Sequence, residues 1–408
     1  MISANLSGQL VAKTNNPLID GVLWGYKWPT TALTYAFPTN ASAFAYALEN
    51  FTPFNATQVS ATLAIFNQMA AVSGLTFSAA ADPSQGNLRA ANVSGIDYQN
   101  RVPPVFTKPA GNQNTAEANP PDPESIKAAY GDALFNPTDF LNPVKGNYAF
   151  FTIIHEFGHS LGLKHGHSEQ TVTGSPTVFP ALPADRDSNE FSVMTYRSFI
   201  GGPVEGGISP EDGGYAQTLM MLDIAALQQM YGANYATNSG NTVYTFSATT
   251  GEMFVNGVGQ GAPSANRVFL TIWDGGGTDT YDFSNYTQDQ SIDLNAGGWS
   301  LFSNIQRANL GAMKAGDPVQ YARGNVFNAL MHQDDVRSLI ENAIGGSGND
   351  TLKGNKVANV LKGNGGNDQI DGGDGIDTAV FQGAKADYTI TKQANGSYIV
   401  ADATASRD

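Results

Sequence analysis

Residues 345–380 read GGSGNDTLK GNKVANVLK GNGGNDQID GGDGIDTAV, which are four successive segments of nine residues. The eighth position of each segment is apolar and holds Leu352, Leu361, Ile370 and Ala379. A period of this length predicts stacked turns and short strands in a parallel β-roll, with these side chains in its core. The alternative is a flexible glycine-rich linker, but a linker needs neither a fixed period nor an apolar residue at a fixed phase.

The first six positions of the segments follow the pattern GGxGxD, which predicts calcium sites. Glycine permits tight turns whose carbonyl oxygens point inward, and aspartate adds a charged oxygen, so the turns offer the hard ligands that calcium prefers. Because alternate turns of a roll lie on the same side, we expect ions between the first and third turns and between the second and fourth. The candidate ligands of the first pair are Gly345, Gly346, Gly348, Asp350, Gly363, Asn364, Gly366 and Asp368, and those of the second pair are Asn355, Val357, Asn359, Gly372, Gly373, Gly375 and Asp377. The second turn departs from the pattern, so a weaker site is predicted there.

The composition of the chain changes after residue 232, where glycine, asparagine, aspartate and threonine become dominant. This change predicts two domains, residues 1–232 and a calcium-binding roll over residues 233–408. Within the second domain, residues 299–337 are interpreted as an insertion of unknown purpose, and apolar segments around residues 395–396 predict a hairpin. We also expect the roll domain to be truncated at its carboxyl terminus, because no closing element follows the hairpin.

The composition also excludes several classes of function. Acidic residues outnumber basic ones by 36 to 21, a net charge of −15, whereas nucleic acids and anionic membranes require a basic surface. Divalent cations are the natural complement to this excess of carboxylates. The absence of cysteine excludes disulfides and zinc sites built from thiolates. No apolar run is long enough for a transmembrane helix, and no Sec signal is visible at the amino terminus.

The first domain mixes segments typical of helices with segments typical of strands. The clearest helix is predicted over residues 148–162, where Phe150, Ile154, Phe157 and Leu161 form one apolar stripe. The other expected elements are strands at residues 33–37 and 75–77, helices over residues 57–73 and 218–231, and an extended proline-rich loop over residues 101–124. The predicted fold class is therefore α+β.

The helix over residues 148–162 contains the start of the sequence HEFGHSLGLKH, residues 155–165. His155 and His159 lie one helical turn apart, so both imidazoles can bind one tetrahedral ion. Glu156 is adjacent on that face, where it can reach a water molecule without binding the metal. Gly162 can adopt a positive φ angle and turn the chain so that His165 becomes the third ligand. Three neutral nitrogens and an open fourth position predict a catalytic zinc site.

Other interpretations of this segment compete with a zinc site. Residues 158–162 also fit GxSxG, the nucleophile elbow of α/β-hydrolases, in which Ser160 would be the nucleophile of an esterase. That interpretation leaves the three residues of the zinc motif without a role, and the apolar stripe has helical spacing. Clustered histidines satisfied within a core would each need a partner. His167 is a second imidazole close to His165, and we expect it to be a solvated loop residue because the turn at Gly162 directs His165 to the metal.

Together with Ser192-Val193-Met194-Thr195-Tyr196, the motif HExxHxxGxxH resembles the metzincin peptidases, and SVMTY is similar to the methionine turn of their serralysin branch. The segment LDIAALQQMYGAN, residues 222–234, also resembles the serralysin helix that leads into a β-roll. The resemblance covers most of residues 145–381 and implies a metzincin-like zinc protease domain followed by a calcium-binding (RTX) β-roll. It further implies that Met194 supports the zinc site and that Tyr196 is an additional zinc ligand, which swings away to steady the oxyanion.

A further calcium site is implied by the loop at residues 274–279, which is similar to a WDxGGxD loop of serralysins. The ligands that this resemblance implies are Asp274, Gly276, Gly277 and Asp279, with Asn238, Gly240 and Thr242 from a preceding loop and Glu341 closing the stack of turns. The chain departs from the family at Asn241, where serralysins usually have aspartate.

These predictions combine into a secreted zinc metalloendopeptidase that hydrolyses peptide bonds of proteins by a zinc-activated water, with Glu156 as general base and Tyr196 at the oxyanion. The expected cofactors are one catalytic Zn²⁺ and several structural Ca²⁺ ions. A roll that folds only with calcium would suit export of an unfolded chain, as the family achieves through type I secretion. We therefore expect a monomer that meets that secretion apparatus and acts outside the cell or at its surface. The alternative from another class is a calcium-dependent surface-attachment module with an inert protease half.

Overall fold

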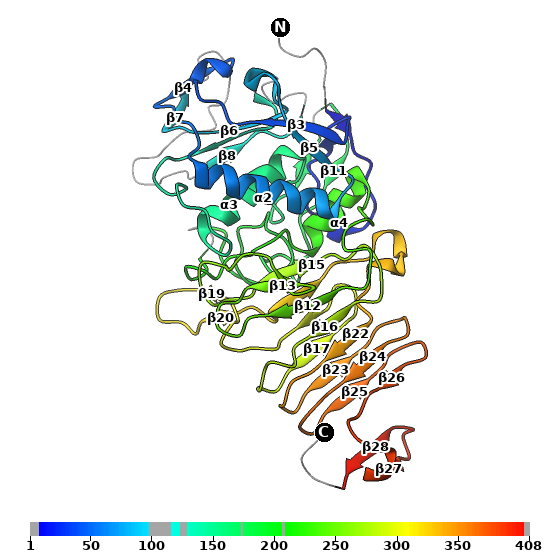
Figure 1. Cartoon of the computed structure of the whole chain (residues 1–408). Helices are drawn as coiled ribbons and strands as arrows, with labels where there is room; N and C mark the ends of the chain where they lie inside the picture. Colours follow the sequence, from blue (N-terminus) through cyan, green and yellow to red (C-terminus); the bar gives the residue numbers. More distant parts are fainter. Residues whose placement is uncertain (1–7, 98–115, 123–128, 173, 206–208, 404–408) are drawn as a thin grey trace. The chain divides into compact units, whose positions relative to one another are not determined.

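The computed structural model describes residues 8–97, 116–122, 129–172, 174–205 and 209–403, and these form two compact units (Figure 1). Unit 1 comprises Met1–Asn234, Phe269–Thr271 and Ala308–Ala322, and unit 2 comprises Tyr235–Val268, Ile272–Arg307 and Arg323–Asp408, within those described residues. Unit 1 therefore includes residues 308–322, which the predicted boundary at residue 232 placed in the second domain.

A five-stranded sheet of order β5-β3-β6-β9-β8 forms the centre of unit 1. The strands from β5 to β9 are parallel, and β8 at the edge is antiparallel to β9. Helices α2 and α3 are on the same side of this sheet in Figure 1. The helices of unit 1 are α1 (Pro17–Asp20), α2 (Ala56–Val72), α3 (Tyr148–Ser160) and α4 (Met221–Tyr231), and its strands are β1 (Gln9–Leu10), β2 (Tyr26–Lys27), β3 (Ala32–Ala36), β4 (Ala47–Glu49), β5 (Thr76–Ala79), β6 (Leu88–Asn92), β7 (Gly95–Asp97), β8 (Ala116–Ala118), β9 (Asp132–Phe135), β10 (Gln170–Thr171), β11 (Val178–Phe179), β19 (Asn309–Gly311) and β20 (Gln320–Tyr321).

Helix α2 joins the sheet to α3 through one aromatic side chain. The helix begins in a capping box, in which Asn55 accepts from the Gln58 amide at 2.9 Å and the Gln58 side chain accepts from the Asn55 amide at 3.0 Å. Phe66 of α2 stacks on Phe77 of β5 at 4.8 Å between ring centroids, and it meets Phe157 of α3 edge-on at 4.7 Å. Aromatic pairs at these distances add to the free energy of burial, so the helix that carries the histidine motif is packed firmly beneath the sheet.

The predicted elements of this unit differ from the structure in several details. Helix α3 begins at the predicted residue and ends at Ser160, and all its residues from Ala149 are buried, so it has no exposed face. Helix α4 begins at Met221, three residues later than predicted (221 − 218 = 3). The prediction of a loop over residues 101–124 is wrong for residues 116–118, which form the edge strand β8. The rest of that predicted loop lies outside the described residues, apart from residues 119–122.

Unit 2 consists mainly of two parallel sheets that the chain enters alternately. One sheet has the order β14-β13-β12-β16-β22-β24-β26 and the other the order β17-β23-β25. Strands β12, β16, β22, β24 and β26 of the first sheet are parallel, and so are all three strands of the second sheet. Strands β13 and β14 extend the first sheet beyond β12 with antiparallel pairing. These strands are β12 (Val243–Phe246), β13 (Met253–Val255), β14 (Val258–Gly259), β16 (Thr280–Asp282), β17 (Ser291–Asp293), β22 (Asn342–Ile344), β23 (Thr351–Lys353), β24 (Val360–Lys362), β25 (Gln369–Asp371) and β26 (Thr378–Ala379).

The apolar residues of the repeat lie in register between successive coils. Leu352 pairs with Ile370, and Leu361 pairs with Ala379. Leu352 and Leu361 are buried as predicted, but Ile370 is half-buried and Ala379 is exposed, so the core of the stack does not include the last coil. The stack also begins earlier than the repeat, because β16 and β17 pair with β22 and β23 across an interruption of the nine-residue period.

The segment interpreted as an insertion, residues 299–337, contains regular structure. Its strands β18 (Trp299–Ser300) and β21 (Val326–Asn328) pair antiparallel. The Asn328 side chain donates to the carbonyls of Asp293 at 2.7 Å and Asn295 at 2.8 Å, at the end of β17. The β19–β20 hairpin of this segment belongs to unit 1, where the Asn309 carbonyl accepts from the Glu211 amide at 3.0 Å.

The remaining described strands are β15 (Leu270–Ile272) and the predicted hairpin of β27 (Tyr388–Lys392) and β28 (Tyr398–Asp402). Among the described residues, no helix has the length and apolar character needed to cross a lipid bilayer.

The buried ion pair of the central sheet generates a prediction about stability. Arg89 of β6 donates two hydrogen bonds of 2.6 Å to Asp132 of β9, whose side chain is fully buried and also accepts from Tyr46. Replacing Asp132 by alanine leaves a buried guanidinium without its carboxylate, so we expect Asp132→Ala to lower the free energy of unfolding by about 3–5 kcal/mol. Asp185→Ala is the matched control, because the Asp185–Arg186 pair is exposed and such pairs contribute about 0–1 kcal/mol. Urea unfolding of both variants measures the difference, and equal losses would contradict the prediction.

Candidate metal centre

Three histidines converge because one helix and one glycine turn position them. His155 and His159 lie one turn apart on α3. After the helix, Gly162 adopts a φ angle of +101°, and a Cβ atom at this position would lie only 2.2 Å from the Tyr26 carbonyl oxygen. Glycine is therefore required there on grounds of both conformation and space. The turn returns the chain towards the helix and brings His165 to the other two imidazoles.

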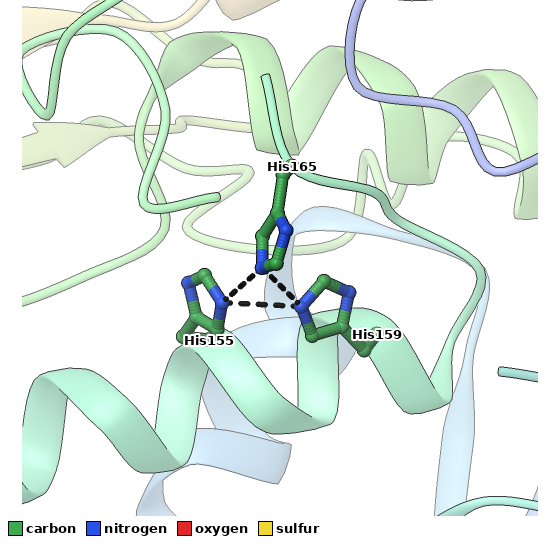
Figure 2. A group of neighbouring side chains, drawn as sticks. All are labelled: His155, His159 and His165. Atoms are coloured by element: carbon green, nitrogen blue, oxygen red, sulfur yellow. Dashed lines mark hydrogen bonds between the residues drawn. The ribbon is translucent and has the colours of Figure 1, made fainter. Parts of the chain in front are cut away.

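The Nε2 atoms of the three histidines face one another at 3.1 Å (His155 to His159), 3.2 Å (His155 to His165) and 3.0 Å (His159 to His165) (Figure 2). Among the described residues, these three histidines form the group of metal-binding side chains whose ligating atoms all lie within 4.8 Å of one another. The prediction that residues 155, 159 and 165 come together is therefore met by the geometry.

Two backbone carbonyls determine which nitrogen of the helical histidines carries the proton. His155 Nδ1 lies 2.8 Å from the Val193 carbonyl oxygen, and His159 Nδ1 lies 2.9 Å from that of Leu163. A carbonyl can only accept, so Nδ1 is protonated in both residues and Nε2 presents a lone pair. Burial lowers the pKa of His155 to about 3 and that of His159 to about 4, and burial together with the neighbouring imidazoles also lowers the pKa of His165. All three side chains are therefore neutral near pH 7, as metal ligands must be.

The chemistry of this donor set fits a divalent metal. Three lone pairs directed at one point repel one another unless a cation lies between them. A tetrahedral ion bound at roughly 2.0–2.1 Å places its nitrogen ligands about 3.3 Å apart, close to the separations in this structure. Three imidazoles without a fourth protein ligand are typical of a catalytic zinc site.

Two carboxylates lie close to the histidines. Burial, and then the charge of Glu117, raises the pKa of Glu156 to about 8, while a hydrogen bond from the Ala118 backbone amide acts in the opposite direction. Glu117 and Ala118 belong to β8, so the edge strand of the sheet borders the carboxylate of α3. Glu117 Oε2 is buried without a hydrogen-bond partner among the described residues, and burial raises the pKa of Glu117 to about 7.

The residues implied by family resemblance also lie at the centre. Met194 is buried beneath α3, and a Cβ atom at Gly158 would lie 2.6 Å from its sulfur. The Tyr196 ring lies 4.4 Å from the ring of His165 and 5.9 Å from that of His155, between centroids. Met194 therefore packs against the helix of the first two histidines, and Tyr196 packs against two of the imidazole rings.

The expectation that His167 is a solvated loop residue and not a ligand is met only in part. The side chain is half-buried, stacks on His165 at 5.2 Å between centroids, and accepts from the Tyr196 backbone amide at 3.3 Å through Nδ1. It does not belong to the group of converging nitrogens. His167 thus supports the third histidine by packing against it, because the loop folds back over the centre and does not extend into solvent.

The esterase interpretation finds no support in the geometry. Ser160 lies in the last turn of α3 and is fully buried, and its hydroxyl donates to the Glu156 carbonyl at 3.2 Å. A nucleophile elbow requires a serine that is exposed on a strand-to-helix turn.

Asp223 is a residue of the site that sequence reasoning missed. Its carboxylate lies in the first turn of α4 and accepts from the Ser192 hydroxyl at 2.6 Å, the Val193 amide at 2.8 Å and the Met220 amide at 2.9 Å. Asp223 thereby holds the turn whose Val193 carbonyl orients His155. An aspartate in the first turn of a predicted helix is a capping signal that could have been found, but its partners from residues 192–193 could not.

The predicted calcium ligands of the upstream loop come together in unit 2. Asp279 accepts from the Thr242 amide at 2.8 Å, and its own amide donates to Glu341 at 2.7 Å. Asp274 accepts from the Gly276 amide at 2.8 Å, and Gly277 approaches Gly240 so closely that a Cβ atom would lie 2.6 Å from the Gly240 carbonyl oxygen. Burial, and then the charge of Asp274, raises the pKa of Asp279 to about 8, and its Oδ2 atom is buried without a hydrogen-bond partner in the described part of the chain. Asn238 contributes its carbonyl, which accepts from Thr242 at 3.1 Å.

The turns of the repeat stack in the two predicted pairs. In the first pair the Asp350 amide donates to Asp368 at 2.8 Å and the Asn364 side chain donates to the Gly345 carbonyl at 2.6 Å. In the second pair the Asn359 amide donates to Asp377 at 2.9 Å. Close approaches that leave no room for a Cβ atom include those of Gly345 to Asp350, Gly346 to Tyr286, Gly348 to Gln288, Gly354 to Gly372, Gly363 to Asp368, Gly366 to Gly348, Gly372 to Asp377 and Gly373 to Asn355, and a Cβ atom at Gly375 would lie 3.0 Å from the Val357 carbonyl oxygen.

Comparison with known proteins gives matches over both units. Residues 233–399 match the family model described as Peptidase M10 serralysin C terminal. The chain is 36% identical over 372 residues to Metalloprotease AprA of Pseudomonas entomophila (strain L48), which covers 88% of this chain and 67% of that protein. It is 32% identical over 341 residues to Metallopeptidase AprA of Pseudomonas marginalis and 32% identical over 340 residues to Serralysin G of Dickeya chrysanthemi. Each of these two alignments covers 81% of this chain and 61% of the relative's length.

The turn at Gly162 generates the prediction for this site. Gly162→Ala places a non-glycine residue at positive φ, which costs roughly 1–2 kcal/mol, and its Cβ atom must also displace the Tyr26 carbonyl. We therefore expect the third histidine to move and the affinity for Zn²⁺, measured by competition with a chromophoric chelator, to fall at least tenfold. Gly201→Ala is the matched control, since Gly201 has a φ of +76° but no atom within 4 Å of the added carbon. The same loss of affinity in both variants would show that the turn does not control the site.

Proposed function

Because this chain belongs to the serralysin family of metalloproteases, we propose that it is a secreted zinc-dependent endopeptidase that hydrolyses peptide bonds in proteins. The observation that carries the proposal is the convergence of three neutral imidazole Nε2 atoms, all within 3.2 Å of one another, beside a buried carboxylate. This combination supports hydrolysis with a metal ion and a general base in one place.

His155, His159 and His165 would hold the zinc ion, with Met194 packed beneath the helix that carries two of them. When bound, the ion supplies a Lewis acid and a positive charge, which polarise a substrate carbonyl and favour the ionised form of the nearby carboxylate. Val193 and Leu163 contribute through their carbonyls, which keep the ligand nitrogens unprotonated.

Glu156 is the proposed general base. It directly follows His155 on α3, and the Ala118 backbone amide holds its side chain at the edge strand. In this position the carboxylate takes a proton from the attacking water and returns it to the amine that leaves. A carboxyl group whose pKa burial has raised towards neutrality is suited to both transfers.

Tyr196 is the proposed donor to the oxyanion. Burial, and then the charge of Glu156, raises the pKa of Tyr196 to about 12, so its hydroxyl remains protonated and can donate a hydrogen bond. A donor of this kind contributes typically about 3 kcal/mol to stabilisation of the transition state.

We further propose that unit 2 is a calcium-binding β-roll. Its acidic groups, the buried Asp274 and Asp279 and the half-buried Glu341, lie together without a basic partner among the described residues, and a cation would relieve their mutual repulsion. A roll that depends on calcium would remain unfolded where calcium is scarce and fold outside the cell, which supports secretion by a type I apparatus.

The rival function, an inert protease half on an attachment module, is less well supported because all groups of the reaction are present. His155, His159 and His165 converge, the Tyr196 ring packs against two of them, and the charge of Glu156 acts on Tyr196. No observation favours an additional function for this centre.

Glu156→Gln tests the proposed function directly. The amide preserves the shape of the side chain but cannot accept a proton, so we expect casein hydrolysis to fall about 10²–10⁴-fold while one zinc ion remains bound. Zinc content by atomic absorption and casein cleavage with a zinc chelator, or with a serine-reactive phosphonate, are the measurements. Glu169→Gln is the control, because Glu169 is an exposed carboxylate of the loop after the third histidine. Appreciable residual proteolysis by the Glu156 variant, or inhibition by the phosphonate, would refute the proposal.

A further inference from the structure

The third histidine of the metal centre differs from the other two in how it is oriented. His155 and His159 each donate Nδ1 to a backbone carbonyl, whereas no acceptor for His165 Nδ1 is found among the described residues. The position of His165 Nε2 therefore depends on the path of its own backbone and on ring packing with its neighbours. Whatever holds the loop over residues 162–168 thus controls one third of the ligand set.

Lys164 holds this loop from inside. Its side chain is buried, with a relative exposure of 1% for the residue, although lysine is rarely found in a protein interior. Nζ donates to the carbonyls of Gly21 at 2.5 Å, Ser168 at 2.7 Å and His165 at 3.2 Å. An ammonium group has three donors, and the three carbonyls match them.

The three acceptors come from the third histidine, from a residue that follows it and from the amino-terminal segment. Two of them, His165 and Ser168, belong to the loop itself, and the third, Gly21, directly follows α1. The backbone joins the same segments, because the Lys164 amide donates to the Val22 carbonyl at 2.8 Å and the Trp24 amide donates to the Gly162 carbonyl at 2.9 Å. The lysine therefore crosslinks the loop to the segment over residues 21–24.

We propose that Lys164 is a positioning residue for the metal centre, which it serves by fixing the loop of His165 against residues 21–24. The inference rests on the proposed function, because it assumes that the three histidines bind zinc. Residues around a metal that orient its ligands typically contribute 10–100-fold to metal affinity. Residues 21–24 are by the same argument part of the metal centre.

The test compares two lysines that both donate to backbone carbonyls in unit 1. Lys164→Met removes the three donors and retains a side chain of similar length, so we expect the Kd for zinc, measured with zinc alone against a chromophoric chelator, to rise about 10–100-fold. Lys27→Met is the matched control, since Lys27 donates to the Met230 carbonyl, and no hydrogen bond from its side chain to residues 162–168 is found among the described residues. It should lower the midpoint of urea unfolding of the metal-free protein but leave the Kd for zinc unchanged.

The outcomes separate the inference from the proposed function. An unchanged Kd in Lys164→Met, or the same rise in Lys27→Met, would overturn the inference. Failure of Lys164→Met to fold while Lys27→Met folds would also overturn it, because the lysine would then be a general structural residue. Absence of zinc binding by the wild-type chain would instead refute the proposed function.

The turn at residues 354–359 carries a second inference, from a different observation. Asn359 occupies the position that aspartate holds in the neighbouring turns, at Asp350, Asp368 and Asp377. Asp350 uses its two carboxylate oxygens as acceptors, from the Gln290 amide at 2.8 Å and the Gly346 amide at 2.7 Å. At residue 359 one of these oxygens is replaced by a nitrogen, which can only donate.

The asparagines of this turn are occupied by hydrogen bonds to the preceding coil. Asn359 Nδ2 donates to the Glu341 carbonyl at 2.8 Å, and Asn355 Nδ2 donates to the carbonyls of Leu294 at 3.0 Å and Ile340 at 2.8 Å. The Asn355 side-chain oxygen accepts from the Val357 amide at 3.1 Å. Both asparagines are buried, so these bonds form in a region of low dielectric, where they are strong.

We infer that amide hydrogen bonds to the preceding coil hold this turn in place of a calcium ion, so that no calcium binds between residues 355–359 and residues 340–341. The chemistry of the donor set does not fit the ion there, because N–H groups are directed at the carbonyls and one negative charge is missing. The contact of this turn with the preceding coil would therefore persist when calcium is removed, unlike the contact between the turns that carry Asp350 and Asp368.

A pair of alanine variants distinguishes a turn held by amide hydrogen bonds from a turn held by a calcium ion. Asn359→Ala should lower the midpoint of thermal unfolding equally in calcium and in EGTA, with the number of calcium ions per chain unchanged in equilibrium dialysis. Asp350→Ala is the matched control at an intact turn, and it should bind at least one ion fewer and lose stability in calcium only. Loss of an ion from Asn359→Ala, or no change in its midpoint, would overturn the inference, whereas a wild-type chain without calcium would refute the proposed roll function.

Discussion

The centre of unit 1 depends on directing three imidazole lone pairs at one point. Such an arrangement is unfavourable without a cation, so the fold has to impose it before any ion binds. It does so with polar groups of the backbone: the carbonyls of Val193 and Leu163 fix the tautomers of the helical histidines, and the Tyr26 carbonyl leaves room only for a glycine at residue 162. The geometry of the ligands is thus determined mainly by residues that never touch the metal.

This constraint reaches elements that are remote in the sequence. The Val193 carbonyl is held in place because Asp223 of α4 binds the turn that carries it, and Lys164 holds the loop of the third histidine against the amino-terminal segment. Helix α3 is buried on all sides, so it cannot rotate to relieve misplaced ligands. A mutation in α4 or at residues 21–24 would therefore act on the same centre as a mutation of a ligand.

The sequence predicted those parts of the molecule that depend on local spacing. His155 and His159 could be placed by the helical period, His165 by the conformational freedom of Gly162, and the coils by a nine-residue repeat. Contacts between distant segments could not be placed in this way. Strand β17 ends at residue 293, yet it pairs with β23, which begins at residue 351. Glu117 lies beside Glu156 because β8 is the edge strand of a sheet, and the sequence does not reveal the order of the strands in that sheet.

Unit 2 meets the same physical problem with negatively charged groups in place of neutral lone pairs. Its acidic turns bring carboxylates together, and a cation is needed to offset their repulsion, just as a cation offsets the converging lone pairs in unit 1. The turn with Asn355 and Asn359 shows the other solution, in which a neutral donor takes the place of the ion. A contact held by an ion depends on the concentration of that ion, whereas a contact held by amide hydrogen bonds does not. With calcium bound as proposed, the numbers of ion contacts and amide contacts would determine how much of the roll is ordered when calcium is scarce.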